Sequence, residues 1–362
     1  MAECHAPVFC VPIASNRSHA DCVVRCGHHR PLDVVLYGAR EHVCVPEYPS
    51  ISSQQRCNVC NGDTWSQDQQ TISIGEHQKG QTMKVGILTA PVSRQPLDKF
   101  IPWAASIGVQ QIELDVGPGG NFDATTVTDS DIANLKNLLA KNNITLSSIV
   151  CYWHTMMTGV TADHLAQSKK VFPAAIKLAP KLGVELVGAL AGFPTQGKSR
   201  LNTIKEDLPV HFRPMADLAR EAGVKIMFEN WYATNLQNLE HFQTIFEVFP
   251  DAHLGLNYDP SHLDWQEIDY IDGVREFQKR IFHVHAKDVW VNPTRRARVG
   301  SNGDGWWRYV LPGYGRIRWG EFITTLRQVG YDGVISVEHE DDAFSPEEGF
   351  VKSVRYLRSL VD

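Results

Sequence analysis

Acidic and imidazole side chains follow four apolar runs in the second half of this 362-residue sequence. The runs end in Phe-Glu-Asn at 228 to 230, Tyr-Asp-Pro-Ser-His at 258 to 262, His-Ala-Lys-Asp at 285 to 288 and Val-Glu-His at 337 to 339. Several carboxylates brought to one rim would repel each other and would be costly to bury. A divalent cation removes that conflict. Three carboxylates and one imidazole form an oxygen-rich ligand set that suits Mn²⁺ or Mg²⁺, with Co²⁺ or Zn²⁺ as alternatives.

Such a site has a definite chemistry. A cation that holds a carbonyl and a neighbouring hydroxyl of a substrate lowers the cost of removing the adjacent C–H proton, and the intermediate is an enediolate. Glu229 and Glu338 would serve as catalytic base and acid while also binding the cation. Return of the proton to the other face gives an epimer and return to the other carbon gives an isomer. Loss of a β-hydroxyl instead gives dehydration.

The elements that must position these residues form a repeating alternation of short β-rich runs and longer amphipathic runs from residue 83 onward. Glycines such as Gly183 and Gly223, and capping residues such as Thr128, mark the helix ends. Eight such units in about 280 residues predict an α/β fold, the (β/α)8 TIM barrel, whose chemistry gathers at the carboxyl ends of the strands. A doubly wound sheet is the rival, but the first run is followed by no glycine-rich phosphate turn. The expected strands span 85–89, 111–116, 145–153, 185–190, 225–231, 254–259, 281–287 and 334–339.

Residues 1–82 differ from the barrel segment, 83–362. They hold seven of the eight cysteines and six of the fifteen histidines, without a sustained helical or alternating pattern. We interpret them as a disordered extension, or as upstream sequence outside the natural protein, because Met83 leads directly into the first core run. The alternative is a zinc module built from Cys22-x3-Cys26 and Cys57-x2-Cys60.

The overall charge excludes some classes of partner. Lys and Arg number 35 against 41 Asp and Glu, a net charge of −6, which argues against a generic electrostatic nucleic-acid binder. No run approaches the roughly 18 to 20 apolar residues of a membrane span, and the first residues lack a signal-peptide pattern. We therefore expect a cytoplasmic protein with no nucleic-acid or membrane partner.

The strand-end motifs resemble those of the xylose isomerase-like TIM barrels, the sugar phosphate isomerase/epimerase family that includes inosose dehydratase and the ketose 3-epimerases. Pro-Gly-Tyr-Gly at 312 to 315, Trp319, and Ile-Glu-Leu at 112 to 114 extend the resemblance. It implies that Glu229, Asp259, His285 and Glu338 are metal ligands, with Mn²⁺ as the first expected ion, and that His262 contacts substrate. It also implies a small sugar or keto-sugar as substrate, and such barrels often form homo-oligomers.

The sequence departs from the ketose 3-epimerases at two places. They carry a second Glu two residues after the fifth-strand ligand, where this chain has Trp231, and an Arg after the seventh-strand His, near Val291 here. A free ketohexose is therefore disfavoured. The aromatic residues Trp153, Trp231 and the pair at 306 and 307 either stack on a sugar ring or pack. The expected substrate contacts are His262, Trp231, His154, Glu113, Arg308 and Lys287.

The segment 289–316 lies between the seventh strand and its helix. A long segment on the catalytic face is commonly a lid, and its arginines at 295, 296 and 298 either grip an anion or form a solvated face. Just before it, Lys287 and Asp288 are expected either to pair with each other or to orient the ligand shell.

Together these features predict a divalent-metal-dependent sugar isomerase or epimerase. The alternatives are a metal-dependent lyase or dehydratase, or a keto-glycoside-cleaving enzyme, of the same family. A remote alternative is an endonuclease IV-like DNA repair nuclease, which shares Asp-x-x-His at 259 to 262. That chemistry needs three zinc ions and an Asp-x-His pair after the seventh strand, which this sequence lacks.

Overall fold

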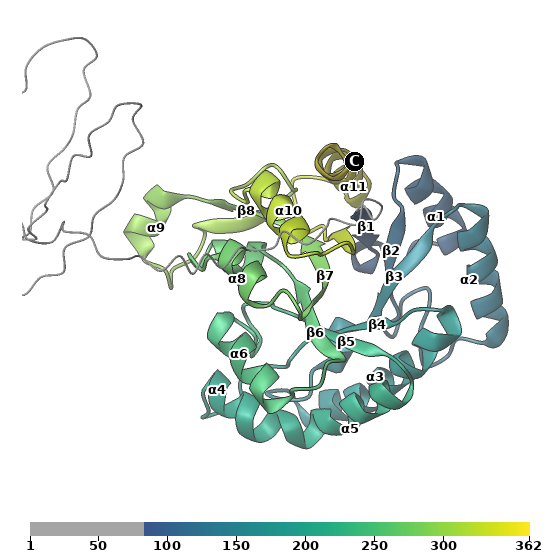
Figure 1. Cartoon of the computed structure of the whole chain (residues 1–362), viewed down its shortest axis with the longest axis horizontal. Coiled ribbons are helices and arrows are strands. Elements are labelled where there is room, and N and C mark those ends of the chain that lie inside the picture. The colour runs from purple at the N-terminus through teal and green to yellow at the C-terminus, as the bar shows by residue number, and fades with distance from the viewer. Residues whose placement is uncertain (1–82) are drawn as a thin grey trace, which may run out of the picture. The chain divides into compact units, whose positions relative to one another are not determined.

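A computed structural model describes residues 83–362, so both interpretations of residues 1–82 concern residues outside the described range. Eight parallel strands close into a barrel in the order β1-β10-β7-β6-β5-β4-β3-β2, with helices around it (Figure 1). The predicted TIM barrel is confirmed, and the doubly wound sheet is wrong. The barrel strands are β1 (Lys84–Leu88), β2 (Gln111–Asp115), β3 (Thr145–Val150), β4 (Leu186–Ala189), β5 (Lys225–Glu229), β6 (Leu254–Tyr258), β7 (Ile281–Ala286) and β10 (Val334–Val337).

The helices between the strands begin and end at residues with recognisable capping chemistry. Thr128 Oγ1 accepts a hydrogen bond from the Asp131 amide at 3.2 Å, and Asp131 Oδ2 accepts from the Thr128 amide at 2.9 Å. This reciprocal capping box starts α2. Gly183 ends α3 with a φ of 76°, which a side-chain-bearing residue rarely adopts. The longer helices are α1 (Leu97–Ser106), α2 (Asp129–Lys141), α3 (Ala162–Leu182), α5 (Leu208–Glu221), α6 (Leu239–Val248), α10 (Trp319–Gln328) and α11 (Pro346–Val361).

Short helical segments fill several connections. They are η1 (Ala90–Val92), η2 (Tyr152–Thr155), α4 (Arg200–Asn202), the π-helical η3 (Thr203–Asp207), α7 (Ser261–Asp264), α8 (Tyr270–Glu276) and α9 (Pro293–Val299). No helix within residues 83–362 is long and apolar enough to cross a membrane.

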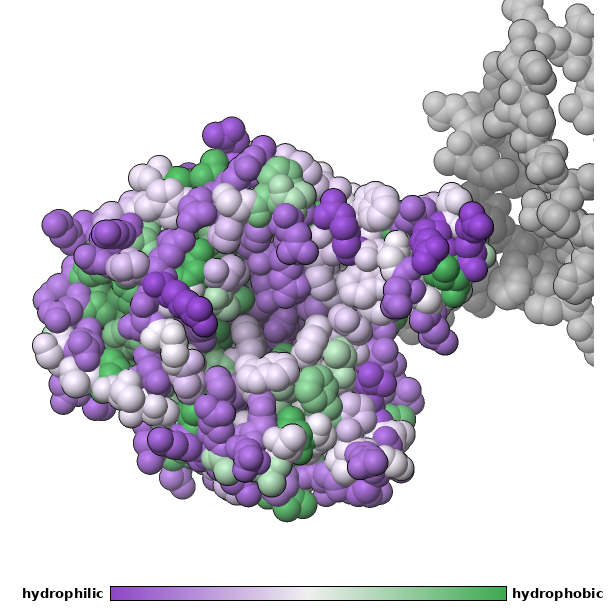
Figure 2. All heavy atoms as spheres, turned by 180° about the vertical axis from the view of Figure 1, so that it is seen from behind, coloured by the Kyte–Doolittle hydropathy of each residue, from purple (hydrophilic) through white to green (hydrophobic). Residues whose placement is uncertain are grey.

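The strands are buried on both faces, as expected for a sheet covered by helices. All five residues of β6 are buried. Gly255 within it allows close approach of β7, because a Cβ at this position would lie 2.4 Å from the Arg280 carbonyl oxygen. The face drawn in Figure 2 mixes hydrophilic and hydrophobic residues and is hollowed near its middle.

The third strand is shorter than expected. The composition predicts a strand over 145–153, but β3 ends at Val150 and the chain turns into η2. Two hydrogen bonds close this turn, from the His154 amide to the Cys151 carbonyl and from Thr155 Oγ1 to the Tyr152 carbonyl, each 2.7 Å long. The turn directs Tyr152 into the barrel and leaves Trp153 54 % exposed.

The segment after β7 is a structured hairpin. Strand β8 (Asp288–Val291) pairs antiparallel with β9 (Trp307–Val310), and α9 lies between them. Arg296 in α9 pairs with Glu267 and lies over the Trp306 ring at 4.8 Å, while its neighbours Arg295 and Arg298 are exposed. The described contacts of this arginine cluster favour the solvated-face interpretation.

Buried Asp288 fixes the base of the hairpin. Its Oδ1 accepts from the amides of Val289 at 2.8 Å and Ile317 at 3.0 Å, and its Oδ2 accepts from the Gly313 amide at 3.0 Å and from Trp319 Nε1 at 2.9 Å. The expected pairing with Lys287 is not found, because adjacent residues of an extended chain point to opposite sides. Asp288 therefore stabilises the base of the hairpin.

We predict that Asp288→Asn lowers the free energy of unfolding by about 2 to 4 kcal/mol, because an amide nitrogen would face donors that now meet a carboxylate oxygen. Urea unfolding measures the change. Asp272→Asn, an exposed position on α8, is the matched control and should change stability by less than about 0.5 kcal/mol. Equal losses in the two variants would contradict the anchoring role.

Candidate active site

Four side chains from the ends of three barrel strands meet at one point. Glu229 ends β5, Asp259 follows β6, His262 lies in α7 and Glu338 follows β10. One oxygen or nitrogen atom of each lies within 4.8 Å of the corresponding atoms of the others. Asp259 and His262 are 0 % and 1 % exposed, and Glu229 is also buried. The geometry thus collects three carboxylates of the predicted ligand set with one imidazole, that of His262, where the prediction had the imidazole of His285.

His285 lies against this four-residue cluster. Its Nδ1 is 3.3 Å from Glu229 Oε1 and 3.1 Å from Glu338 Oε2, whereas its Nε2 points the other way, 3.1 Å from Glu113 Oε2. The predicted ligands Glu229, Asp259, His285 and Glu338 are therefore neighbours. His262, predicted only as a substrate contact, shares the cluster with the three carboxylates.

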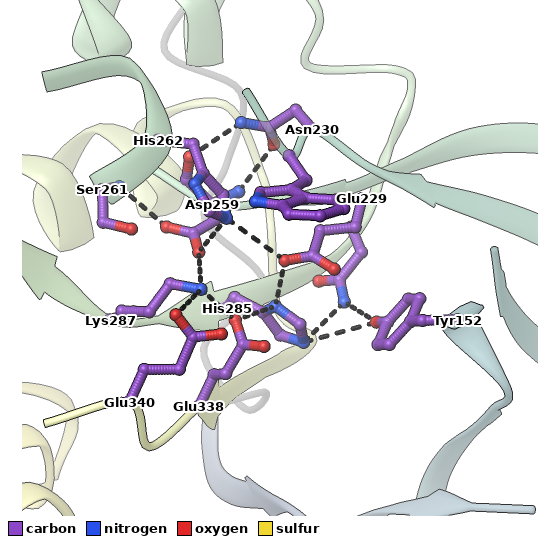
Figure 3. Close-up of polar contacts among 12 residues, drawn as sticks. Tyr152, Glu229, Asn230, Asp259, Ser261, His262, His285, Lys287, Glu338 and Glu340 are labelled. Atoms are coloured by element: carbon purple, nitrogen blue, oxygen red, sulfur yellow. Dashed lines mark hydrogen bonds and ion pairs between the residues drawn. The ribbon is translucent and has the colours of Figure 1, made fainter. Parts of the chain in front are cut away.

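Lys287 is the internal cation of the site (Figure 3). Its Nζ is 2.5 Å from Glu338 Oε2, 3.4 Å from Asp259 Oδ2 and 3.5 Å from Glu340 Oε2, and the residue is 1 % exposed. Burial alone would lower the pKa of Lys287, but the charges of Glu338, Glu340 and Asp259 raise it well above its ordinary value. The ammonium is thus charged at neutral pH and keeps the nearby carboxylates ionised.

The carboxylates are held ionised despite their burial. Burial acts to raise the pKa of Glu229, but the charge of His285 and the close contacts of His262 and His285 lower it far below its ordinary value. Burial and the charge of Glu229 likewise oppose ionisation of Glu338, yet the charges of Lys287 and His285 lower its pKa. Both groups therefore stand ready to accept a proton or a cation.

Two atoms of the cluster lack a hydrogen-bond partner among the described residues. They are Asp259 Oδ2 and His262 Nε2, both buried, and His262 Nε2 lies 3.4 Å from Glu229 Oε1. An unpaired buried polar atom is costly, and the oxygen and nitrogen donors here are those that divalent cations prefer. The residues present therefore fit a divalent cation.

Tyr309 of the hairpin completes the wall of the site, and sequence reasoning missed it. Its hydroxyl is 2.6 Å from His262 Nδ1, and Lys287 Nζ lies 4.6 Å from its ring centroid. The alternation of β9 places Trp307 and Tyr309 on one face of the strand. That alternation in the sequence could have pointed to Tyr309, once the segment was recognised as a strand.

The remaining predicted substrate contacts lie outside the four-residue cluster. Trp231 is half-buried, with its ring centroid 5.8 Å from that of Phe193, and His154 is half-buried after β3. Arg308 forms an ion pair with Asp341 at 2.7 Å. Glu113 is 0 % exposed and lies behind His285.

Only part of the predicted aromatic set is available to a ligand. Trp153 is exposed and Trp307 is half-buried, its ring stacked on Trp265 at 4.4 Å between centroids. Trp306 is 1 % exposed, so it packs inside the hairpin.

The family model described as "Xylose isomerase-like TIM barrel" matches residues 101–360. The chain belongs to this family. A relative from Bacillus subtilis, the uncharacterised protein YfiH, is 28 % identical over 318 residues, covering 77 % of this chain and 99 % of YfiH. Inosose dehydratase from Geobacillus thermodenitrificans is 28 % identical over 152 residues, covering 40 % of this chain and half of that enzyme.

Solved structures share the fold of the family. The IolI protein, solved with a bound zinc atom, matches with a TM-score of 0.60 and 19 % identity, covering 77 % of this chain and 98 % of IolI. The 3-keto-D-glucoside 4-epimerase YcjR from E. coli matches with a TM-score of 0.60 and 15 % identity, covering 76 % and 99 %. Named proteins with this barrel thus include an epimerase, a dehydratase and a zinc-binding protein.

We predict that a divalent cation stabilises the protein. At Mn²⁺ about 100-fold above its dissociation constant, the free energy of unfolding should rise by about 2.7 kcal/mol, and EDTA should reverse the gain. Thermal unfolding with and without Mn²⁺ measures it. Asp259→Asn should abolish the gain, whereas Asp332→Asn, at an exposed position, should preserve it. A Mn²⁺ response that survives Asp259→Asn would place the ion elsewhere.

We also predict that Tyr309→Phe costs about 0.5 to 1.5 kcal/mol of unfolding free energy, since His262 Nδ1 loses its hydroxyl partner while the ring is retained. Chemical denaturation gives the value. Tyr314→Phe is the control, because the Tyr314 ring is 53 % exposed. A loss no greater than that of the control would show that the contact to His262 contributes nothing to stability.

Proposed function

We propose that the protein is a divalent-metal-dependent sugar isomerase or epimerase that moves a proton at the carbon next to a carbonyl. One observation carries the proposal. Glu229, at the end of β5, and Glu338, after β10, both bring a carboxylate oxygen to His285 Nδ1, at 3.3 Å and 3.1 Å, within the buried cluster (Figure 3). Two carboxylates that reach one centre from non-adjacent strands are placed to act as a base and an acid on a bound substrate.

In this proposal Glu229, Asp259 and Glu338 hold the cation, with nitrogen from His285 or His262. Mn²⁺ is the first expected ion, and Mg²⁺, Co²⁺ and Zn²⁺ are alternatives. When bound, the cation polarises the carbonyl of the substrate and makes the neighbouring proton more acidic. The zinc bound by IolI supports a metal in this fold, and the oxygen-rich cluster supports a hard cation here.

The side chains divide the remaining work. Glu338 receives the proton at a carboxylate oxygen, and the Lys287 ammonium at 2.5 Å holds that oxygen in place. Glu229 takes a proton from a substrate hydroxyl or from solvent and returns it to the intermediate. His262 directs its Nε2 into the cluster and is fixed from behind by Tyr309, so it is placed to bind a substrate hydroxyl. The hairpin over the site limits access of water to the reacting carbon.

A metal-dependent lyase or dehydratase is the second candidate function. It is favoured by the inosose dehydratase relative, and the same proton removal followed by loss of a β-hydroxyl would give it. Trp231, which replaces a carboxylate of the ketose 3-epimerases, favours a substrate with an apolar face such as a keto-glycoside. The endonuclease IV-like alternative is not taken further, because no Asp-x-His pair follows His285.

The nature of the partner follows from the same site. We propose a small sugar or keto-sugar as substrate, and we retain the homo-oligomer, the cytoplasmic location and the absence of nucleic-acid and membrane partners as predictions.

We predict solvent deuterium exchange at the carbon beside the carbonyl when the metal-loaded protein meets its substrate in a panel of keto-sugars, keto-glycosides and inososes. Glu338→Gln should slow the exchange roughly 10²- to 10⁴-fold, since it removes a proton acceptor. Glu276→Gln, on the exposed face of α8, is the control and should leave the rate unchanged. Nuclear magnetic resonance measures the exchange.

Product mass separates the two candidates. Isomerisation or epimerisation leaves the mass unchanged, whereas dehydration removes one water. The proposal fails if no member of the panel exchanges in a protein shown to contain metal.

A further inference from the structure

We propose that Glu113 is a positioning residue for the metal centre. Its carboxylate accepts a hydrogen bond from His285 Nε2, and this bond turns the lone pair of His285 Nδ1 toward Glu229 and Glu338. The inference rests on the proposed function, since it takes the cluster to be a cation site. It replaces the sequence-based expectation that Glu113 contacts substrate.

The two nitrogens of His285 face different surroundings. Nδ1 lies 3.3 Å and 3.1 Å from the carboxylate oxygens of Glu229 and Glu338, and Nε2 lies 3.1 Å from Glu113 Oε2. A histidine ligand gives one nitrogen to the metal and commonly donates the other N–H to a carboxylate, which fixes the tautomer and the ring orientation. The positions of these groups assign Nδ1 to the cation and the Nε2 proton to Glu113.

The surroundings of Glu113 agree with this assignment. Its Oε1 accepts from the Tyr152 hydroxyl at 2.7 Å, and Asn257 Nδ2 is 2.6 Å from the Tyr152 oxygen and 3.3 Å from Glu113 Oε1. Asn257 Oδ1 then accepts from His283 Nδ1 at 3.1 Å, which leaves His283 Nε2 to accept from Ser147 Oγ at 3.1 Å. Asn257 Nδ2 also lies 2.8 Å from His285 Nε2 and presents a donor to it. Of these two neighbours, only Glu113 Oε2 can accept a proton from Nε2. Oε2 of Glu113 therefore receives the Nε2 proton of His285.

The position of Glu113 fits an acceptor. The residue is 0 % exposed, and its Oε1 already accepts from the Tyr152 hydroxyl. A buried carboxylate raises the basicity of the imidazole to which it is bonded and limits rotation of the ring.

A competing arrangement uses the same atoms. Glu113, His283 and His285 are close enough to hold a cation of their own. That arrangement would break the bonds from His283 to Asn257 and Ser147, because both of its nitrogens are engaged. The hydrogen-bonded arrangement keeps both bonds of His283, so it is the one we adopt.

The first test is the affinity for the metal alone. Glu113→Gln keeps the shape of the side chain and removes its charge, and it should weaken Mn²⁺ binding roughly 10- to 100-fold in calorimetry, with one ion per chain in both proteins. Asp115→Asn is the matched control, because Asp115 lies on the same strand but its carboxylate accepts from the Gly117 amide. The control should bind Mn²⁺ as tightly as the unmodified protein.

Two calorimetric results would overturn the inference. One is an unchanged affinity of folded Glu113→Gln. The other is a stoichiometry of two ions that falls to one in the variant, which would make Glu113 a ligand.

The second test needs no variant. In zinc-loaded protein carrying ¹⁵N-labelled histidine, the His285 ring should show a protonated Nε2 and a zinc-shifted Nδ1. A protonated Nδ1, or zinc on Nε2, would overturn the inference even if Glu113→Gln failed to fold. Both tests measure binding, so a failure of deuterium exchange with every keto-sugar would leave their outcome unaffected and would concern the proposed function alone.

Discussion

Buried negative charge at the carboxyl ends of the strands is the constraint on which the rest of the site depends. Glu113, Glu229 and Asp259 are buried and Glu338 is nearly so, while Lys287 is the one ammonium group that contacts the cluster among the described residues. Charges removed from water are costly unless they are paired and hydrogen-bonded. In the folded protein, Lys287 lies between two carboxylates, and the imidazole of His285 lies among three. Asp259 Oδ2 and His262 Nε2 form no hydrogen bond among the described residues and are available to a cation.

A second layer of structure covers the charged centre. The hairpin of β8 and β9 starts one residue after Lys287, and Asp288 and Asp341 hold it in place through bonds to the backbone and to Arg308. It delivers Tyr309 to His262 and Trp307 to the neighbouring aromatic rings. The hairpin and the charged centre thus depend on two adjacent residues, Asp288 and Lys287, whose side chains point to opposite sides of the chain.

The features that could be predicted from the sequence are those that local residue patterns determine. Apolar runs indicated the eight strands, and an acid or imidazole after a run had to lie on the common rim. Spacing therefore predicted the place of Glu229, Asp259 and His285, whereas their role as ligands came from the family resemblance. Contacts between distant segments were not predictable in the same way. Tyr309 and His262 are 47 residues apart, and Glu113 and His285 are 172 apart.

The errors have physical causes too. The pattern of residues 145 to 153 favours a strand, but hydrogen bonds within η2 turn the chain earlier, which a composition of aromatic residues cannot show. Glu113, on β2, faces His285, on β7, across the interior of the barrel and not along neighbouring strands. This contact exists only when the sheet has closed on itself. Metal affinity would therefore report on closure of the barrel. A sheet without the pairing of β1 with β10 would keep the donors on the adjacent strands β5, β6, β7 and β10 but would lose the contact of Glu113 with His285.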